Sequence, residues 1–143
     1  MLKCSNKFSR KLGLFASMIL CFNIVFADPT DGCELGTNEL FLTESGSVLY
    51  SSSDDIAGFQ FQVEGAELIE AFGGLAADNN FDVMVNADMV LGFAYDGSVI
   101  PEGSSGVLTN LNFNALSSEL CFNPGSGGFV DLDGEPFNVD FGD

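Results

Sequence analysis

The sequence has no histidine, and its few basic residues are confined to one end. All four Lys and Arg lie within residues 1–11, whereas the 21 Asp and Glu begin at Asp28. Nucleic-acid binding depends on basic side chains that neutralise phosphates, so the acidic part of the chain is excluded from that class. Anionic membrane surfaces would repel it for the same reason. A Ser or Cys hydrolase needs a base such as His or Lys beside the nucleophile, so that chemistry is excluded as well.

The first residues have the pattern of a secretory signal peptide. A basic leader, 1–11, precedes an apolar stretch, 12–27, that ends in the small residue Ala27. The stretch is shorter than the roughly 20 apolar residues that a membrane-spanning helix needs. We therefore expect cleavage after Ala27 and a secreted, extracellular protein of 116 residues that carries all the acids and no basic side chain. An uncleaved anchor and a lipoprotein signal through Cys21 are the alternatives.

Cysteine is scarce beyond the leader, where Cys33 and Cys121 remain. Two cysteines in a secreted chain commonly pair, so we expect a disulfide between them, with two free thiols as the alternative. In the chain-entropy model a bridge across so long a loop contributes about 4 kcal/mol.

Short β-strands are indicated along the whole acidic region, separated by turns rich in Gly, Asp, Asn and Ser. The clearest is 56–63, where Phe59, Phe61 and Val63 alternate with Gln60 and Gln62. The expected strands are 39–43, 47–52, 56–63, 67–72, 81–85, 89–95, 107–113, 119–123, 129–132 and 136–141.

Two further local features are expected from the pattern. In 107–113 the residues Val107, Thr109, Leu111 and Phe113 are expected on one side of the strand. The glycine pair after residue 72 predicts a turn or a short helical excursion up to residue 80.

Ten short strands and no long helix predict an all-β fold, namely one antiparallel β-sandwich of jelly-roll type with nine or ten strands. The expected organisation is a signal peptide, 1–27, an N-terminal arm, 28–37, and the sandwich domain, 38–143. Asp133-Gly134 predicts a tight hairpin turn between the last two strands.

Several segments together resemble a cohesin-like domain, across roughly residues 38–141. The elements that carry this resemblance are Gly58-Phe59-Gln60-Phe61, Gly73-Gly74, Val90-Leu91-Gly92-Phe93, and Ile100-Pro101-x-Gly103 leading to Gly106-Val107-Leu108. The resemblance implies a jelly-roll β-sandwich, related in fold to certain carbohydrate-binding modules and without catalytic activity. It also implies a protein partner bound across one sheet face, dockerin-like or another extracellular protein. Fold carries over between such relatives more safely than function does.

Three sets of residues are candidate sites. The outward-facing Gln60 and Gln62 are the candidate partner-binding face, although they suit the wet side of any half-buried strand. The sequence lacks tryptophan, so Tyr50 and Tyr95 are the candidate sugar contacts, with half-buried packing as the alternative.

The third set is a candidate Ca²⁺ site around the hairpin turn. Asp131, Asp133 and Glu135 cluster there, and calcium prefers such oxygen ligands, although solvated acids on a plain hairpin fit equally well. We expect no required cofactor. The predicted function is a secreted, non-catalytic recognition or scaffolding module that binds a protein. The alternative is a carbohydrate-binding module on extracellular polysaccharide, with or without calcium, and a small carboxylate hydrolase is a distant third.

Overall fold

The structure, a computed structural model, describes residues 27–142. The expected signal peptide therefore lies outside the described residues apart from Ala27. Among the residues described, no helix is long and apolar enough to cross a membrane.

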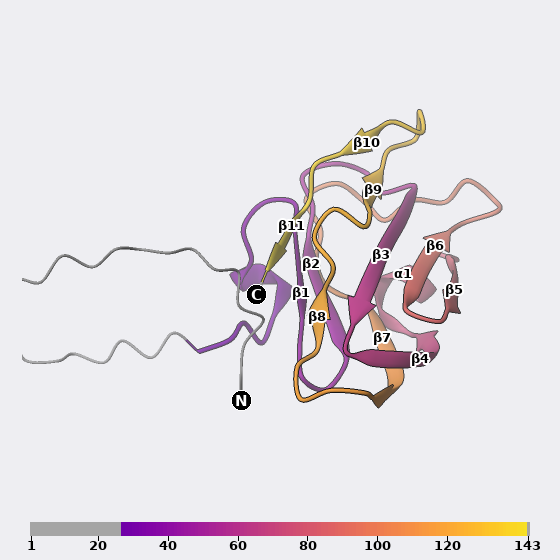
Figure 1. Cartoon of the computed structure of the whole chain (residues 1–143). Coiled ribbons are helices and arrows are strands. Elements are labelled where there is room, and N and C mark those ends of the chain that lie inside the picture. The colour runs from indigo at the N-terminus through magenta and orange to yellow at the C-terminus, as the bar shows by residue number, and fades with distance from the viewer. Residues whose placement is uncertain (1–26, 143) are drawn as a thin grey trace, which may run out of the picture.

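The described chain is built almost wholly from strands (Figure 1). Two short helices interrupt them, the 3₁₀ helix η1 (Gly32–Glu34) and α1 (Gly74–Asp78). The second is the helical excursion expected before residue 80. The strands are β1 (Glu39–Leu42), β2 (Ser47–Ser51), β3 (Gly58–Glu64), β4 (Ala66–Phe72), β5 (Asp82–Asn86), β6 (Met89–Phe93), β7 (Ser105–Ala115), β8 (Cys121–Phe122), β9 (Gly128–Val130), β10 (Pro136–Phe137) and β11 (Asp140–Gly142).

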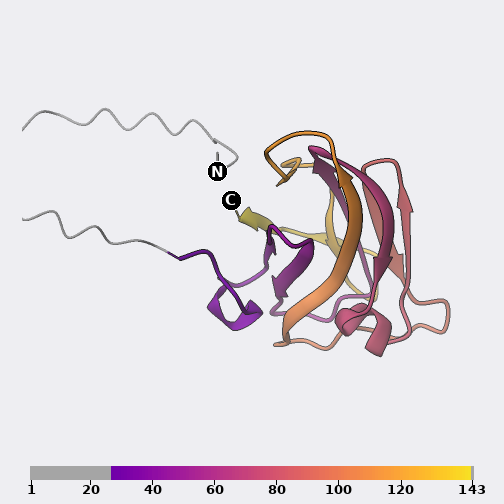
Figure 2. The ribbon, with the colours of Figure 1, turned by 90° about the horizontal axis from the view of Figure 1, so that it is seen from below.

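Two sheets form a β-sandwich, which confirms the predicted fold class (Figures 1 and 2). The five-stranded sheet has the order β11-β1-β2-β7-β4, and the six-stranded sheet has the order β10-β9-β3-β6-β5, with β8 paired to β3. The chain passes repeatedly from one sheet to the other, for example from β2 to β3 and from β3 to β4. Strands that are neighbours in a sheet are therefore mostly distant in sequence.

The last predicted strand, 136–141, is divided between the two sheets. Its first part, β10, forms the expected hairpin with β9 around Asp133-Gly134, where Gly134 has a φ of 80°. Its second part, β11, crosses over and pairs with β1 in parallel. The crossing lets both aromatic residues of the segment pack, Phe137 against Phe129 and Phe141 against Phe122, with ring centroids 5.5 and 5.3 Å apart. Residues 27–142 thus form eleven strands, and one pair among them is not antiparallel.

A β-bulge in β7 overturns one expected alternation. Val48 pairs with Thr109 but the next residue, Leu49, pairs with Val107, so an extra residue on β7 lies between them. Because a bulge shifts the side-chain alternation by one residue, Val107 faces outward while Thr109 and Leu111 face the core.

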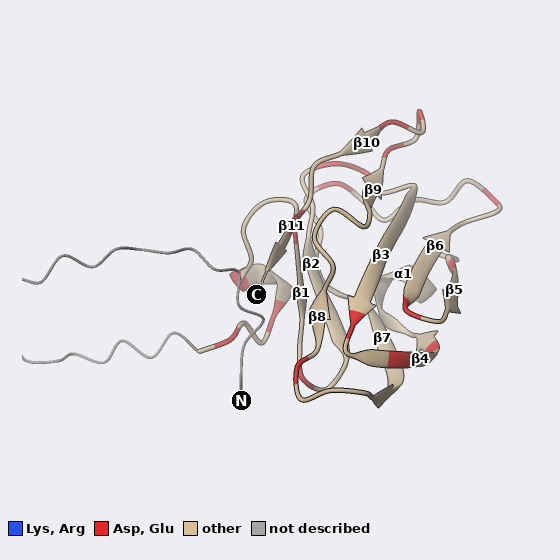
Figure 3. Cartoon of the chain, in the orientation of Figure 1, with Lys and Arg blue, Asp and Glu red and all other residues tan. Residues whose placement is uncertain are grey.

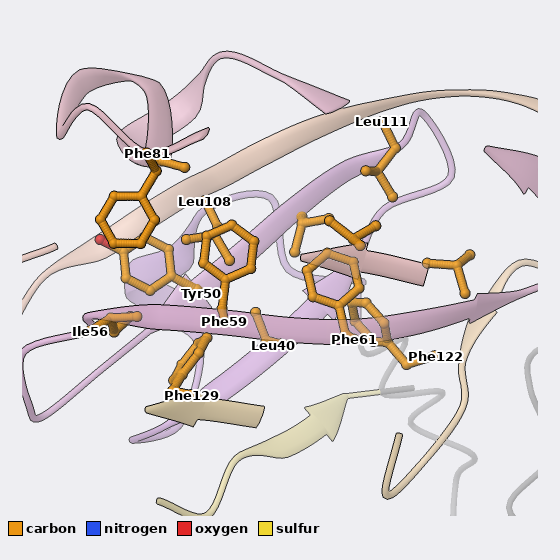
Figure 4. Packing of buried hydrophobic residues seen from close by; sticks show 14 of the residues in the cluster. Leu40, Tyr50, Ile56, Phe59, Phe61, Phe81, Leu108, Leu111, Phe122 and Phe129 are labelled. Atoms are coloured by element: carbon orange, nitrogen blue, oxygen red, sulfur yellow. The ribbon is translucent and has the colours of Figure 1, made fainter. Parts of the chain in front are cut away.

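The core is dominated by phenylalanine. A continuous series of ring contacts runs from Phe81 through Phe59, Phe61 and Phe122 to Phe141, with centroid separations of 5.2–6.0 Å. Figure 4 shows the rings of Phe81 and Phe59 beside Tyr50 and Leu108, between the two sheets. The strict alternation in β3 produces this arrangement, because Phe59, Phe61 and Val63 are buried as predicted.

Candidate functional site

The outward face of the six-stranded sheet carries apolar residues where polar ones are usual. Residues that lie directly opposite each other on paired strands point to the same face of the sheet. One row of such residues crosses four strands of this sheet. The row consists of Met84 on β5, Leu91 on β6, Gln60 on β3 and Gly128 on β9. Met84 is 45% exposed and Leu91 is 37% exposed. Two apolar side chains are therefore displayed beside the predicted partner-binding residue Gln60.

A second row runs from Asp82 through Phe93 and Gly58 to Val130. Except for Met84 and Asp82 at their β5 ends, both rows line a groove. Gly58 lacks a side chain, as Gly128 does in the first row, so the sheet is hollowed between Phe93 and the C-terminal segment. The groove has a volume of about 980 Å³ and is also lined by the 124–128 loop and residues 136–141.

Gln62, the other residue of the predicted face, is part of an internal network. Its Nε2 donates a hydrogen bond to Asp88, and its Oε1 accepts one from Asn123 Nδ2 at 2.9 Å. Ser126 Oγ accepts a hydrogen bond from the Gln62 backbone N–H at 3.0 Å. The side chain thus ties β3 to the β5–β6 turn and to the 123–126 turn, and it supports the face more than it presents a free amide. Gln60 is exposed and makes one hydrogen bond, at 3.3 Å, from its Nε2 to the Ser126 carbonyl.

The rim of this face is acidic (Figure 3). Asp82 lies in the same row as Phe93, and Asp96 follows Tyr95 in the next loop. Hydrogen bonds from Ser98, from its hydroxyl and then its backbone N–H, lower the pKa of Asp96. The carboxylate of Asp96 therefore stays ionised to a lower pH than an unpartnered one would.

The two predicted sugar contacts do not form a platform. Tyr50 is fully buried in the core, so its assignment as a sugar contact is wrong. It faces the core because its β2 position pairs with Leu40 and Gly106, whose positions also face inward. Tyr95 is 79% exposed, and its ring packs edge-on against Phe93 with centroids 4.7 Å apart. It adds to the apolar surface beside the groove.

Burial raises the pKa of the Tyr50 hydroxyl, against a smaller opposing effect of its hydrogen bond to Ser104 Oγ at 2.7 Å. A group whose pKa is raised by folding contributes stability that is fully present below its unfolded-state pKa, which is about 10 for tyrosine. This contribution is lost as the pH rises through the folded-state pKa. We therefore expect Tyr50 to ionise only above about pH 10, at the pH where the protein unfolds. Ultraviolet absorption of phenolate would follow this phase, and Tyr50→Phe should remove it. A Tyr50 phenolate that formed near pH 10 in the folded protein would contradict the expectation.

The predicted disulfide between Cys33 and Cys121 is wrong. Cys33 has a free, exposed thiol, and its Sγ is hydrogen-bonded to Ser105 Oγ, at the start of β7, at 3.3 Å. Cys121 pairs with the end of β3, next to Ala66, which pairs with the last residue of β7. An eleven-residue strand is about 33 Å long, whereas a disulfide needs Cα atoms within about 7 Å. The two cysteines lie near opposite ends of β7.

The predicted calcium ligands do not converge. Asp131 Oδ1 accepts hydrogen bonds from the backbone N–H groups of Asp133 and Glu135, each at 2.9 Å, so its carboxylate caps its own turn. Within residues 27–142, no three Asp, Glu, Cys or His side chains are arranged so that they could hold a metal ion. The described residues at this turn fit a solvated hairpin better than a Ca²⁺ site.

The fold is similar to that of a non-cellulosomal cohesin from the hyperthermophilic archaeon Archaeoglobus fulgidus, a member of the family that the sequence motifs resemble. The similarity covers 73% of this chain and 84% of that one, with 16% sequence identity and a TM-score of 0.47. No protein-family model matches the chain, and no curated protein matches it.

The residues that dominate this face were missed from the sequence. Met84 and Leu91 occur in strands rich in apolar residues, so their exposure was not evident. The signal was present in the alternation, because Val83, Val85 and Val90 occupy the inward positions and leave Met84 and Leu91 outward. An apolar residue at an outward position is a better indicator of an interface than a glutamine is.

Proposed function

We propose that this domain is a secreted, non-catalytic recognition module that binds a protein partner, dockerin-like or another extracellular protein. It uses the outward face of β9, β3, β6 and β5. The proposal is carried by one observation, the exposed apolar pair Met84 and Leu91 beside a groove with a glycine floor. Protein interfaces combine an apolar centre with a polar rim, and this face has both.

The arrangement suits a partner that inserts one side chain. Gly58 and Gly128 leave room above β3 and β9, and the walls include Leu91, Phe93 and Val139. An apolar anchor entering such a groove would be desolvated on several sides, as hot-spot residues are. Gln60 lines the groove beside Leu91 and can add a directional hydrogen bond.

Affinity capture from the extracellular fraction of the source would test this function. We expect the wild-type domain to retain a partner, and Met84→Thr/Leu91→Thr to weaken its binding by at least about 30-fold, since a hot-spot truncation costs 2 kcal/mol or more. Threonine suits a strand, so the fold should persist.

A matched control removes two exposed apolar residues from elsewhere. Ile69→Thr/Leu116→Thr makes the same kind of change on β4 and after β7, at residues 52% and 71% exposed. Its capture of the partner should equal that of the wild type. If both double variants lost partner binding equally, or if neither lost it, the assignment of the partner to this face would be refuted.

A further inference from the structure

Three asparagines occupy alternate positions of β7, on the outer face of the five-stranded sheet. Asn110, Asn112 and Asn114 face outward, while Leu111 and Phe113 between them pack into the core. Asparagine is depleted in strands because its side chain competes for backbone hydrogen bonds. Such local departures from strand preference tend to occur where a surface has a function.

The neighbouring edge strand β4 completes this surface. Its register places Glu67 opposite Asn114, Glu70 opposite Asn112 and Phe72 opposite Asn110. Figure 3 shows the acidic residues of β4 in red. These six residues, Glu67, Glu70, Phe72, Asn110, Asn112 and Asn114, are called the amide face below. It belongs to the opposite sheet from the candidate protein-binding face.

Hydrogen bonds within the fold hold one end of the amide face in place. Asn110 Oδ1 accepts a hydrogen bond from Ser47 Oγ at 2.9 Å, and Asn110 Nδ2 donates to the Phe72 carbonyl at 3.4 Å. Thr109 Oγ1 donates to the same carbonyl at 3.3 Å. These bonds fix the backbone of Phe72, whose ring is 51% exposed.

The other polar side chains of the amide face are unused within the fold. Asn112 and Asn114 are exposed, as are the two glutamates opposite them. Among residues 27–142 none of these four side chains has a hydrogen-bond partner. Two carboxylate–amide pairs therefore stand side by side, with Cβ atoms about 4.5–5.5 Å apart within a pair and about 6.8 Å between positions along β7.

We propose that the amide face binds a neutral polysaccharide chain. An amide both donates and accepts hydrogen bonds, and a carboxylate accepts them, which matches sugar hydroxyls that do both. The pairs repeat along β7, with the exposed Ile69 of a register shift between the two glutamates of β4, so they can engage successive units of a polymer. The exposed ring of Phe72 offers an apolar surface for the C–H face of a sugar ring.

The charge of the domain limits the class of ligand. No Lys, Arg or His occurs among the described residues, so an anionic polymer would be repelled and its charges could not be paired. A neutral, hydroxyl-rich chain supplies hydrogen-bond donors to the carboxylates without any cation.

Native affinity electrophoresis with soluble mixed-linkage β-glucan, xylan and galactomannan would test the proposal. We expect at least one of these neutral polymers to retard the purified protein, and anionic alginate not to do so. Asn112→Ala/Asn114→Ala should lower the apparent association constant about tenfold, because two hydrogen bonds are lost. Phe72→Ala should lower it by a similar factor.

The matched control is Asn86→Ala, which removes an exposed strand amide from the other sheet. It should be retarded as the wild type is, and circular dichroism should show the same fold in all variants. Unchanged migration of the wild type with all three polymers would overturn the proposal, as would equal retardation of the wild type and the Asn112/Asn114 variant. A protein captured by the wild type but lost in that variant, with no polymer bound, would assign the amide face to a protein instead.

Discussion

Phe61→Ala is expected to lower the free energy of unfolding by about 3–5 kcal/mol, a large fraction of the 5–15 kcal/mol typical of a domain. Phe61 is fully buried, and its ring lies between those of Phe59 and Phe122, at centroid distances of 6.0 and 5.2 Å. Removing the ring leaves a cavity in the middle of the aromatic series, and rigid strands on both sides limit its collapse. Urea denaturation followed by circular dichroism would measure the loss.

The matched control for this variant is Phe72→Ala. Phe72 is half exposed on the outer face, so its truncation leaves no cavity and should change stability by no more than about 0.5 kcal/mol. If Phe61→Ala cost less than about 1 kcal/mol with an unchanged urea dependence, the central position of this ring would be wrong. The same Phe72 variant also serves the polysaccharide experiment, where it must remain folded.

Gly92→Ala is expected to destabilise the domain by about 3 kcal/mol, the upper end of the usual cost of overpacking a core. A Cβ on Gly92 would lie 2.7 Å from Cε2 of Phe59 and closer still to other atoms of that ring. The two residues are direct partners on β6 and β3, so the far end of the ring lies over the glycine. Because Phe59 is also packed against Phe61 and Phe81, its ring has no free space into which to move.

Two variants separate this clash from a general effect of replacing glycine in a strand. Gly128→Ala lies in the same sheet, and its added Cβ would make only ordinary contacts, the nearest at 3.5 Å, so we expect a change within about 0.5 kcal/mol. Phe59→Leu should recover part of the loss when combined with Gly92→Ala, since a smaller side chain relieves the overlap. Additive costs in the double variant would show that the ring is not the cause. Thermal and urea unfolding would measure the wild type, the three single variants and the double variant.

Much of the fold was predictable because the decisive patterns are local. The alternation of Phe59, Phe61 and Val63 with two glutamines determines which side of β3 is buried, whatever strands surround it. The pair Asp133-Gly134 predicts where the hairpin turns. Gly134 has a φ of 80°, a conformation that glycine adopts without strain. The division of 136–141 between two sheets was not predictable, since it depends on the distant partners Phe129 and Phe122.

The candidate sites were less predictable, because each depends on which strands become neighbours. Gln60 was identified, but the apolar residues beside it belong to β5 and β6, which pair with β3 only in the folded sheet. Tyr50 was misassigned because an aromatic residue in a short strand has no sequence mark that distinguishes core from surface. The predicted disulfide between Cys33 and Cys121 was wrong. Two cysteines in a secreted protein favour a bridge, but these two residues lie near opposite ends of the long strand β7.

The sequence by itself determined the chemistry that is excluded and the strands that are half-buried. A chain segment with no basic side chain cannot pair phosphate charges with cationic side chains in any fold, and a two-residue period buries one side of a strand in any sheet. Only the tertiary structure decided which exposed residues lie together, namely Met84 with Leu91 on one sheet and Glu70 with Asn112 on the other. The physical reason is that hydrogen bonding between backbones sets the strand order and register, and these bonds join residues far apart in the chain.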